Sequence, residues 1–228
     1  MTITMFRQEL DGWRLSRYGR PVRWSSQCLS LAGPAGLWLV AEGELDLFAY
    51  GHRRWHPLGR LGPGALVPAS VPGPTYVLVA RPLAGCVVRR LVWGAPGSVA
   101  PSGEDLDAFA RGVDSGLGPL LSAVAGAPVA GTPTLLPGYQ VELRPGDAAR
   151  PVHGIVWLRV LHGRVGGLGA GAVLATDDTV SSETGAVVGV DTTGDLLRSG
   201  VLWPHLAAEE LRLRHALGRR IDGPAHLR

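Results

Sequence analysis

The sequence contains no lysine and no asparagine, so all 22 of its basic residues are arginines. Without lysine the chain can neither form a lysine Schiff base nor supply the lysine of a phosphate-binding loop. Charged residues make up 18% of the chain and hydrophobic residues 46%, which is an ordinary globular composition. The net charge of +3 is small and the arginines are dispersed, so we expect no nucleic-acid partner.

Long hydrophobic runs are also absent. No run reaches the roughly 18 apolar residues that a membrane-spanning helix needs, so we expect no membrane span. The first twenty residues, MTITMFRQELDGWRLSRYGR, contain no apolar core followed by a cleavage site. We therefore expect a cytoplasmic location, where thiols stay reduced. The two cysteines, Cys28 and Cys86, are expected to be buried apolar side chains.

Glycine and proline are abundant, at 33 and 18 residues, and they divide the chain into short apolar runs. Runs of this length between turn residues are typical of strands. In residues 20–93 the runs are LWLVAEG, ELDLFAYG, GALVPASV, TYVLVARP and CVVRRLVW. After residue 132 they are YQVELRPG, GIVWLRVLHG, GAVLAT and GAVVGVDTT. Antiparallel strands with glycine turns and no crossover helices favour a jelly roll.

Two segments show helical periodicity instead. In residues 102–125, apolar residues recur at spacings of three and four behind the capping residue Ser102. Gly116, Gly118 and Pro119 are expected to divide this segment into two short helices. A last helix is expected from about Pro204, with leucines recurring and arginines near its end.

The two strand-rich segments resemble each other. LWLVAEGELDLFA aligns with VWLRVLHGRVGGL, and LGPGALVPAS aligns with LGAGAVLATD, which places Trp38 opposite Trp157. This self-similarity predicts two copies of one supersecondary unit. We predict a mainly β protein with a few helices and two tandem β-roll (jelly-roll) domains. The expected boundaries are a first roll at 1–100, a helical linker at 101–131, a second roll at 132–203 and a C-terminal helix at 204–228.

Several of these motifs carry a family resemblance. YGRPV, LWLVAEGELDLFA, LGPGALV, GIVWLRVLHG and LLRSGVLWP together resemble the N-terminal region of ABC transporters that export nitrile-hydratase-leader-type bacteriocins. The resemblance covers residues 17–220 and implies cyclic-nucleotide-binding-like β-rolls in a natural-product context. The 228 residues contain neither a membrane span nor a GxxxxGK[ST] loop, so we carry over neither export nor ATP hydrolysis.

Cyclic-nucleotide binding would need charged donors at the phosphate. The corresponding stretches, residues 62–67 and 169–174, contain no Glu and no Arg, and Arg81 is the nearest arginine to the first of them. The glycine-rich stretch at 166–171 is followed by a strand-like run, not by the helix N-terminus that a phosphate loop requires. The sequence therefore predicts no cofactor, and the rolls are expected to be degenerate.

The histidines, serines and acidic pairs do not form recognisable sites. Cupin-like β-rolls that hold a metal use a His-x-His pattern, which is absent here, so no metal is predicted. No serine lies in a GxSxG elbow, and adjacent acids on a strand point to opposite faces. The residues considered, and given no catalytic or metal-binding role, are His52, His56, His153, His162, Ser25, Ser26, Ser181, Ser182, Asp177, Asp178, Glu209 and Glu210.

Seven tryptophans remain: Trp13, Trp24, Trp38, Trp55, Trp93, Trp157 and Trp203. Trp38 and Trp157 are interpreted as core residues, or alternatively as the lining of an apolar pocket. Trp13, Trp24 and Trp55 lie in arginine-rich stretches and fit a partner surface. The candidate ligand or partner residues are Trp38, Trp55, Trp157, Arg81 and His153.

We therefore predict a binding or accessory protein without intrinsic catalysis. Its partner would be a peptide, a protein or a small apolar molecule, in a bacteriocin-like biosynthetic pathway. A homodimer through the C-terminal helix is a further option. Two alternatives stay open: a metal-free cyclase or isomerase with a tryptophan-lined pocket, and a sensor that kept the cyclic-nucleotide fold but lost its ligand.

Overall fold

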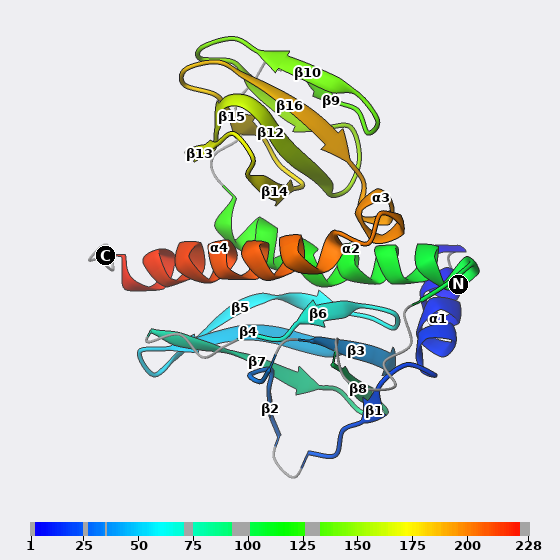
Figure 1. The fold of residues 1–228 in the computed structure, drawn as a ribbon. Coiled ribbons are helices and arrows are strands. Elements are labelled where there is room, and N and C mark those ends of the chain that lie inside the picture. Colours follow the sequence, from blue (N-terminus) through cyan, green and yellow to red (C-terminus); the bar gives the residue numbers. More distant parts are fainter. Residues whose placement is uncertain are drawn as a thin grey trace. The chain divides into compact units, whose positions relative to one another are not determined.

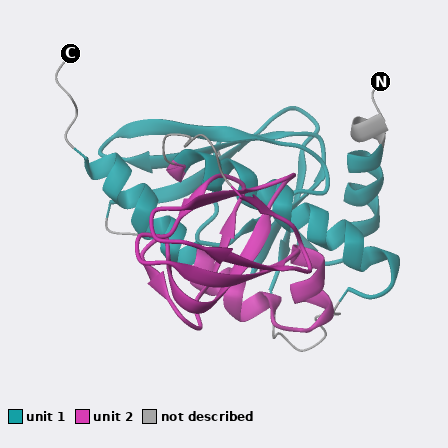
Figure 2. Cartoon of the chain, turned by 90° about the horizontal axis from the view of Figure 1, so that it is seen from above, with its two compact units in different colours: residues 1–123, 210–228 teal, residues 124–209 magenta. Residues whose placement is uncertain are grey.

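The computed structural model describes residues 3–24, 27–34, 36–70, 75–92, 101–125 and 133–223. The chain divides into two compact units, which Figure 2 distinguishes by colour. Unit 1 contains Met1–Ala123 and Glu210–Arg228, and unit 2 contains Val124–Glu209. The described residues form sixteen strands and four helices, which confirms the prediction of a mainly β chain with a few helices.

Unit 1 is an antiparallel β-roll of two four-stranded sheets, ordered β1-β8-β3-β6 and β2-β7-β4-β5 (Figure 1). This order, in which each sheet alternates strands from the two ends of the segment, is that of a jelly roll. The strands are β1 Arg20–Pro21, β2 Leu29–Ser30, β3 Leu37–Glu42, β4 Leu45–Gly51, β5 Arg54–Leu61, β6 Leu66–Pro68, β7 Tyr76–Pro82 and β8 Val87–Leu91.

One sheet of unit 2 has the same strand order as one sheet of unit 1. β12 pairs with both β14 and β16, and β16 also pairs with β10, so these four strands have the order of β1-β8-β3-β6 in unit 1. A second sheet has the order β15-β11-β9. The strands are β9 Thr134–Leu135, β10 Gln140–Leu143, β11 Ala148–Pro151, β12 Val156–Val165, β13 Leu168–Gly169, β14 Val173–Thr176, β15 Val180–Ser181 and β16 Ala186–Asp191.

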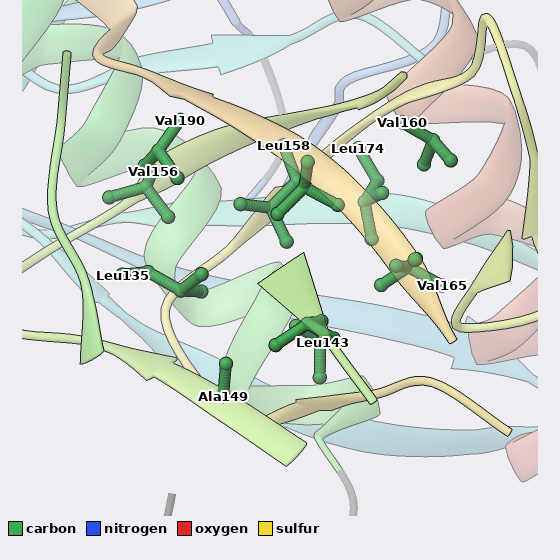
Figure 3. Packing of buried hydrophobic residues seen from close by; sticks show 12 residues of the cluster. Leu135, Leu143, Ala149, Val156, Leu158, Val160, Val165, Leu174 and Val190 are labelled. Atoms are coloured by element: carbon green, nitrogen blue, oxygen red, sulfur yellow. The ribbon is translucent and has the colours of Figure 1, made fainter. Parts of the chain in front are cut away.

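The interior of the unit 2 roll is filled with aliphatic side chains. Alternate residues of β12, namely Val156, Leu158 and Val160, point into a cluster that Figure 3 shows from close by. Leu174 of β14, which pairs with β12, and Leu143 of β10 belong to the same cluster. Before the β-bulge that follows Val160, the odd positions Trp157 and Arg159 point away from this cluster, because a strand alternates its faces; beyond the bulge Val165 joins the cluster.

Backbone hydrogen bonds correct the predicted match between the two tryptophans. Val40 exchanges hydrogen bonds with the Gly64–Ala65 segment, and Val160 does the same with Gly171–Ala172. Val40 therefore corresponds to Val160, which makes Trp38 the counterpart of Leu158 rather than of Trp157. A β-bulge follows Val160, just as one follows Val40. The alignment of letters that pairs Trp38 with Trp157 is therefore wrong by one residue. A one-residue shift turns a side chain to the other face of a strand.

Helix α2 spans Glu104–Val124 without interruption, so the predicted division into two helices is wrong. Pro119 removes the hydrogen bond to the carbonyl of Ser115, which lies on the exposed side of the helix and can bond water instead. Gly112 and Gly116 are buried against β6. The glycines thus serve close packing of the helix on the roll rather than its termination.

Helix α1, Ile3–Leu15, was not predicted, because its buried face lacks the expected apolar pattern. That face contains Asp11, Gly12 and Leu15. The Asp11 carboxylate accepts two hydrogen bonds of 2.8 Å from Arg111 of α2, and Gly12 touches the backbone of β3 at Ala41. Helix α1 is therefore held on unit 1 partly by an ion pair and by close backbone packing.

Two further helices complete the described chain. α3, Thr193–Arg198, begins with a capping box formed by Thr192 and Asp195. α4, Leu202–Asp222, begins close to the predicted start, and its second half belongs to unit 1. There it meets β7, where the Tyr76 hydroxyl donates to the Arg214 carbonyl at 3.4 Å. The predicted boundaries at 1–100, 101–131, 132–203 and 204–228 remain a proposal.

Replacement of Gly116 by alanine should destabilise unit 1, because its Cβ would lie 2.0 Å from the Leu66 carbonyl oxygen. We expect the free energy of unfolding to fall by about 1–3 kcal/mol, the usual cost of overpacking. The same replacement at Gly118, whose Cβ would meet nothing within 4 Å, should be neutral or stabilising by up to about 1 kcal/mol. Thermal unfolding followed by circular dichroism compares the two variants, and equal midpoints would contradict this packing.

Candidate functional site: the outer face of the β2-β7-β4-β5 sheet

The alternation of β4 builds the candidate surface on unit 1. Leu45, Leu47 and Ala49 are at most 1% exposed and point into the roll. The residues between them, Asp46, Phe48 and Tyr50, therefore share the outer face of the sheet. β5 and β7 flank β4 on either side and contribute side chains to the same face.

Three aromatic rings lie together at one end of this face. Trp55 is directly opposite Tyr50 across the β4–β5 ladder, and their ring centroids are 4.9 Å apart. The Trp55 ring also meets Phe48 edge-on, at 5.5 Å and 85°. Such pairs stabilise by about 0.5–1.5 kcal/mol beyond the area they bury. The indole remains 49% exposed, so a rigidly held aromatic surface faces solvent.

Two arginines continue the face beyond the rings. The Arg81 guanidinium carbon lies 5.6 Å from the centroid of Phe48, in cation–π geometry. The Asp46 carboxylate accepts a 2.7 Å hydrogen bond from Arg60 Nε and a 2.8 Å bond from Arg81 Nη2. These bonds, from Arg60 first and then Arg81, lower the pKa of Asp46 below its usual value. We call the six residues Asp46, Phe48, Tyr50, Trp55, Arg60 and Arg81 the aromatic–arginine face.

The β4–β5 turn adds positive charge beside Trp55. His52 and Arg53 adopt left-handed conformations, with φ of 49° and 61°, as a two-residue hairpin turn requires. His52 Nε2 lies 2.7 Å from a carboxylate oxygen of Asp222 in α4. The side chains of Arg53 and Arg54 are exposed. Arg53 of the turn thus lies next to the aromatic end of the face, whereas Arg54, the neighbour of Trp55 on β5, points to the other side of the strand.

Of the five candidate residues from sequence, the structure brings two together. Trp55 and Arg81 both contact Phe48 on the aromatic–arginine face. Trp38 is buried and its indole donates to the Leu31 carbonyl at 2.9 Å. Trp157 is fully buried, and its indole donates to the Thr193 hydroxyl of the same unit at 2.8 Å. His153 is exposed on a turn before β12.

Trp38 also stacks against an arginine. The Arg90 guanidinium carbon lies 4.8 Å from the Trp38 ring centroid. The same guanidinium donates to the carbonyls of Leu91, Leu37 and Pro34, and burial lowers the pKa of Arg90. Arg90 therefore links backbone segments at the end of the first roll through hydrogen bonds to their carbonyls.

Sequence reasoning missed Phe48, Tyr50, Asp46 and Arg60 as site residues. The signal was present in ELDLFAYG, because strict alternation places Asp46, Phe48 and Tyr50 on one face. Which residues of β5 and β7 lie opposite them depends on strand register. A β-bulge between Leu47 and Phe48 changes which residues of β5 lie opposite β4, and no feature of the sequence predicts it.

Two other motifs considered in the sequence analysis contribute to packing and hydrogen bonding of the fold. Gly64, within the stretch considered for a phosphate, contacts Gly12 of α1 and Gly112 of α2. The Ser182 hydroxyl is buried and donates to the Arg164 carbonyl at 2.7 Å. Ser25, Ser26 and Trp93 lie outside the described residues. Within the described residues, no three His, Cys, Asp or Glu side chains are grouped as metal ligands would be.

The two cysteines differ in burial. Cys86 is 7% exposed, as predicted, and burial raises the pKa of its thiol to about 11. Cys28 is only half-buried, so its prediction as a core residue is wrong. Within the described residues the two cysteines form no disulfide. Among the helices described, none combines the length and the apolar character that a membrane crossing needs.

No family model matches the sequence, and no curated protein matches it. The chain is similar to several solved structures. One is cAMP-bound PfPKA-R (141–441), at 8% identity and a TM-score of 0.30, covering 96% of this chain and 92% of that one. Another is the regulatory subunit of a cAMP-independent protein kinase A from Trypanosoma brucei, at 13% identity and a TM-score of 0.28, covering 98% of this chain and 91% of that one.

A third similar structure is the cAMP complex of the regulatory domain of Toxoplasma gondii PKA, at 14% identity and a TM-score of 0.25, covering 83% of each chain. The cAMP in these descriptions belongs to those proteins. Since the TM-scores are this low, the assignment of β-rolls rests on the strand order and pairing given above.

Replacement of Asp46 by asparagine should weaken the aromatic–arginine face. Both arginines are more than half exposed, so we expect a loss of only about 1 kcal/mol of unfolding free energy at pH 7. The pKa of Asp46 is depressed in the folded state, so its contribution is present above the unfolded pKa of about 3.9 and is lost as pH falls through the lower folded value. Urea unfolding at pH 7 and below pH 3 measures this. A difference that persists at the lower pH would contradict the ion-pair origin.

Proposed function

We propose that the chain is a binding protein without catalytic chemistry of its own. Its aromatic–arginine face would hold a polypeptide segment that carries carboxylates beside an apolar side chain. The observation that carries this proposal is the exposed Trp55 ring, fixed between Phe48 and Tyr50 and flanked by Arg81 and Arg60. Exposed tryptophan and arginine are the residues that most often dominate binding energy at protein interfaces.

The charge of the face supports an acidic partner. Arg53 lies on the β4–β5 turn, Arg60 on β5 and Arg81 on β7, whereas Asp46 and Glu44 are the acids bonded to this group. Three positive charges against two leave a small excess of positive charge beside an aromatic surface. A guanidinium also offers paired donors to a carboxylate, even while one of its edges is held by Asp46.

A polypeptide suits this face better than a small apolar molecule in a roll. The interior of the second roll is filled by the aliphatic cluster around Leu158. Trp157 points away from that interior and is covered at Thr193. In the first roll Trp38 is stacked by Arg90. These contacts give no support to the alternative of a cyclase or isomerase with a tryptophan-lined pocket.

The finer parts of the proposal rest on the sequence alone. They are the degenerate cyclic-nucleotide-binding-like rolls, the bacteriocin-like pathway and a cytoplasmic location. A homodimer through α4 has less to recommend it, because Leu213 and Leu217 of that helix are already buried in the single chain.

Peptide display tests the proposal directly. The full chain is immobilised and a random peptide library is selected on it, and the best peptide is resynthesised for titration calorimetry. We expect selected peptides to combine Asp or Glu with Trp, Phe or Leu. Trp55→Ala and Arg81→Ala should each weaken binding about tenfold or more, which corresponds to at least about 1.4 kcal/mol.

Matched replacements in unit 2 provide the controls. Tyr139 is 66% exposed and Arg144 is exposed, so Tyr139→Ala and Arg144→Ala remove the same kinds of side chain elsewhere. Both should leave the affinity unchanged. The proposal fails if the selection enriches no acidic and apolar peptides, or if their binding is insensitive to Trp55 and Arg81.

A further inference from the structure

A groove of about 430 Å³ lies beside α1 in unit 1, and none of the six residues of the aromatic–arginine face lines it. Its floor is apolar and backbone-rich, because it is formed by Ala41 and Gly43 of the β3–β4 hairpin and by Gly62 and Pro63 after β5. The volume is within the range of about 300–1,000 Å³ that is usual for ligand sites. We call it the α1 groove.

One side of the α1 groove is an exposed tryptophan. Trp13 is 72% exposed, the most exposed of the large hydrophobic side chains in the described residues. Glu9 lies one helical turn before it, so both residues project from the same side of α1. An aromatic ring that is exposed to water beside an apolar surface offers a face on which a ligand group can stack.

Three carboxylates line the same groove as Trp13. Glu9 comes from α1, and Glu42 and Glu44 flank the turn at Gly43, whose φ is +69°. Glu44 lies 3.5 Å from Arg60, whereas Glu9 and Glu42 are exposed and make no hydrogen bond or ion pair among the described residues. The basic residue next to Trp13, Arg14, is directed to Glu104 at 2.8 Å. The groove is therefore locally acidic on a chain of positive net charge.

We infer that the α1 groove receives an arginine side chain of a basic peptide. A guanidinium can stack flat on the Trp13 ring while its edge donates to Glu9 or Glu42, which satisfies both halves of the site. The end of α1, at Leu15, also favours a cation nearby, because helix C-termini carry partial negative charge. This site is separate from the one in the proposed function and takes a ligand of opposite charge.

Binding of a labelled heptapeptide with two arginines among glycines and serines tests this inference. Its affinity for the full chain is measured by fluorescence anisotropy, beside a copy with citrulline in place of arginine. Citrulline keeps the shape of the side chain and removes its charge. We expect the arginine peptide to bind at least tenfold more tightly, and to weaken as salt rises.

Substitutions locate the site. Trp13→Ala should weaken the arginine peptide about threefold to thirtyfold, the range of a cation–π contact. Glu9→Gln combined with Glu42→Gln should weaken it about tenfold. The matched control, Glu142→Gln with Glu183→Gln, removes two exposed carboxylates from unit 2 and should change nothing.

The outcomes separate this site from the aromatic–arginine face. Trp55→Ala with Arg81→Ala should leave the arginine peptide bound, even if those changes abolish the acidic peptide. The inference is overturned if the citrulline copy binds equally, if the arginine peptide does not bind below millimolar concentration, or if Trp13→Ala and the glutamine pair leave its affinity unchanged in a folded chain. Circular dichroism establishes the folding of each variant.

Discussion

Unit 1 depends on a close approach of three backbone segments at Gly12, Gly64 and Gly112. A Cβ at Gly12 would lie 2.5 Å from the Ala41 carbonyl oxygen, and one at Gly112 would lie 2.4 Å from that of Gly64. Gly64 itself has a φ of +86°, which side chains rarely adopt. Helices α1 and α2 can therefore rest on the roll only because all three residues lack a side chain. The bidentate hydrogen bonds from Arg111 to Asp11 lie beside these three glycines and hold α1 on the roll.

Most strands of the fold could be predicted from the sequence, because their apolar runs are bounded by glycine and proline. β3, β4, β7 and β8 lie where LWLVAEG, ELDLFAYG, TYVLVARP and CVVRRLVW predicted them. α1 could not be predicted in the same way, since its buried face uses Asp11 and Gly12. Continuity of α2 through Pro119 was also hidden, because it depends on tertiary contacts of the glycines that precede the proline.

The candidate site was predicted only in part. Trp55 and Arg81 could be selected because tryptophan and arginine are common in interfaces, yet nothing in their sequence separation indicated that both contact Phe48. Trp38 and Trp157 were paired from matching letters, but matching letters do not reveal an offset of one residue before a bulge. As a result Trp38 points into its roll and Trp157 points out of the other one.

Glu44 belongs to both surfaces of unit 1, since it lines the α1 groove and approaches Arg60 at 3.5 Å. A cation in the groove competes with Arg60 for that carboxylate, and it frees a guanidinium for an acidic segment on the neighbouring face. The two ligands would then assist each other, and by thermodynamic reciprocity each would strengthen the other by the same factor. Because the pair is exposed to solvent, that factor is small. A single partner with alternating basic and acidic stretches would gain from both contacts at once.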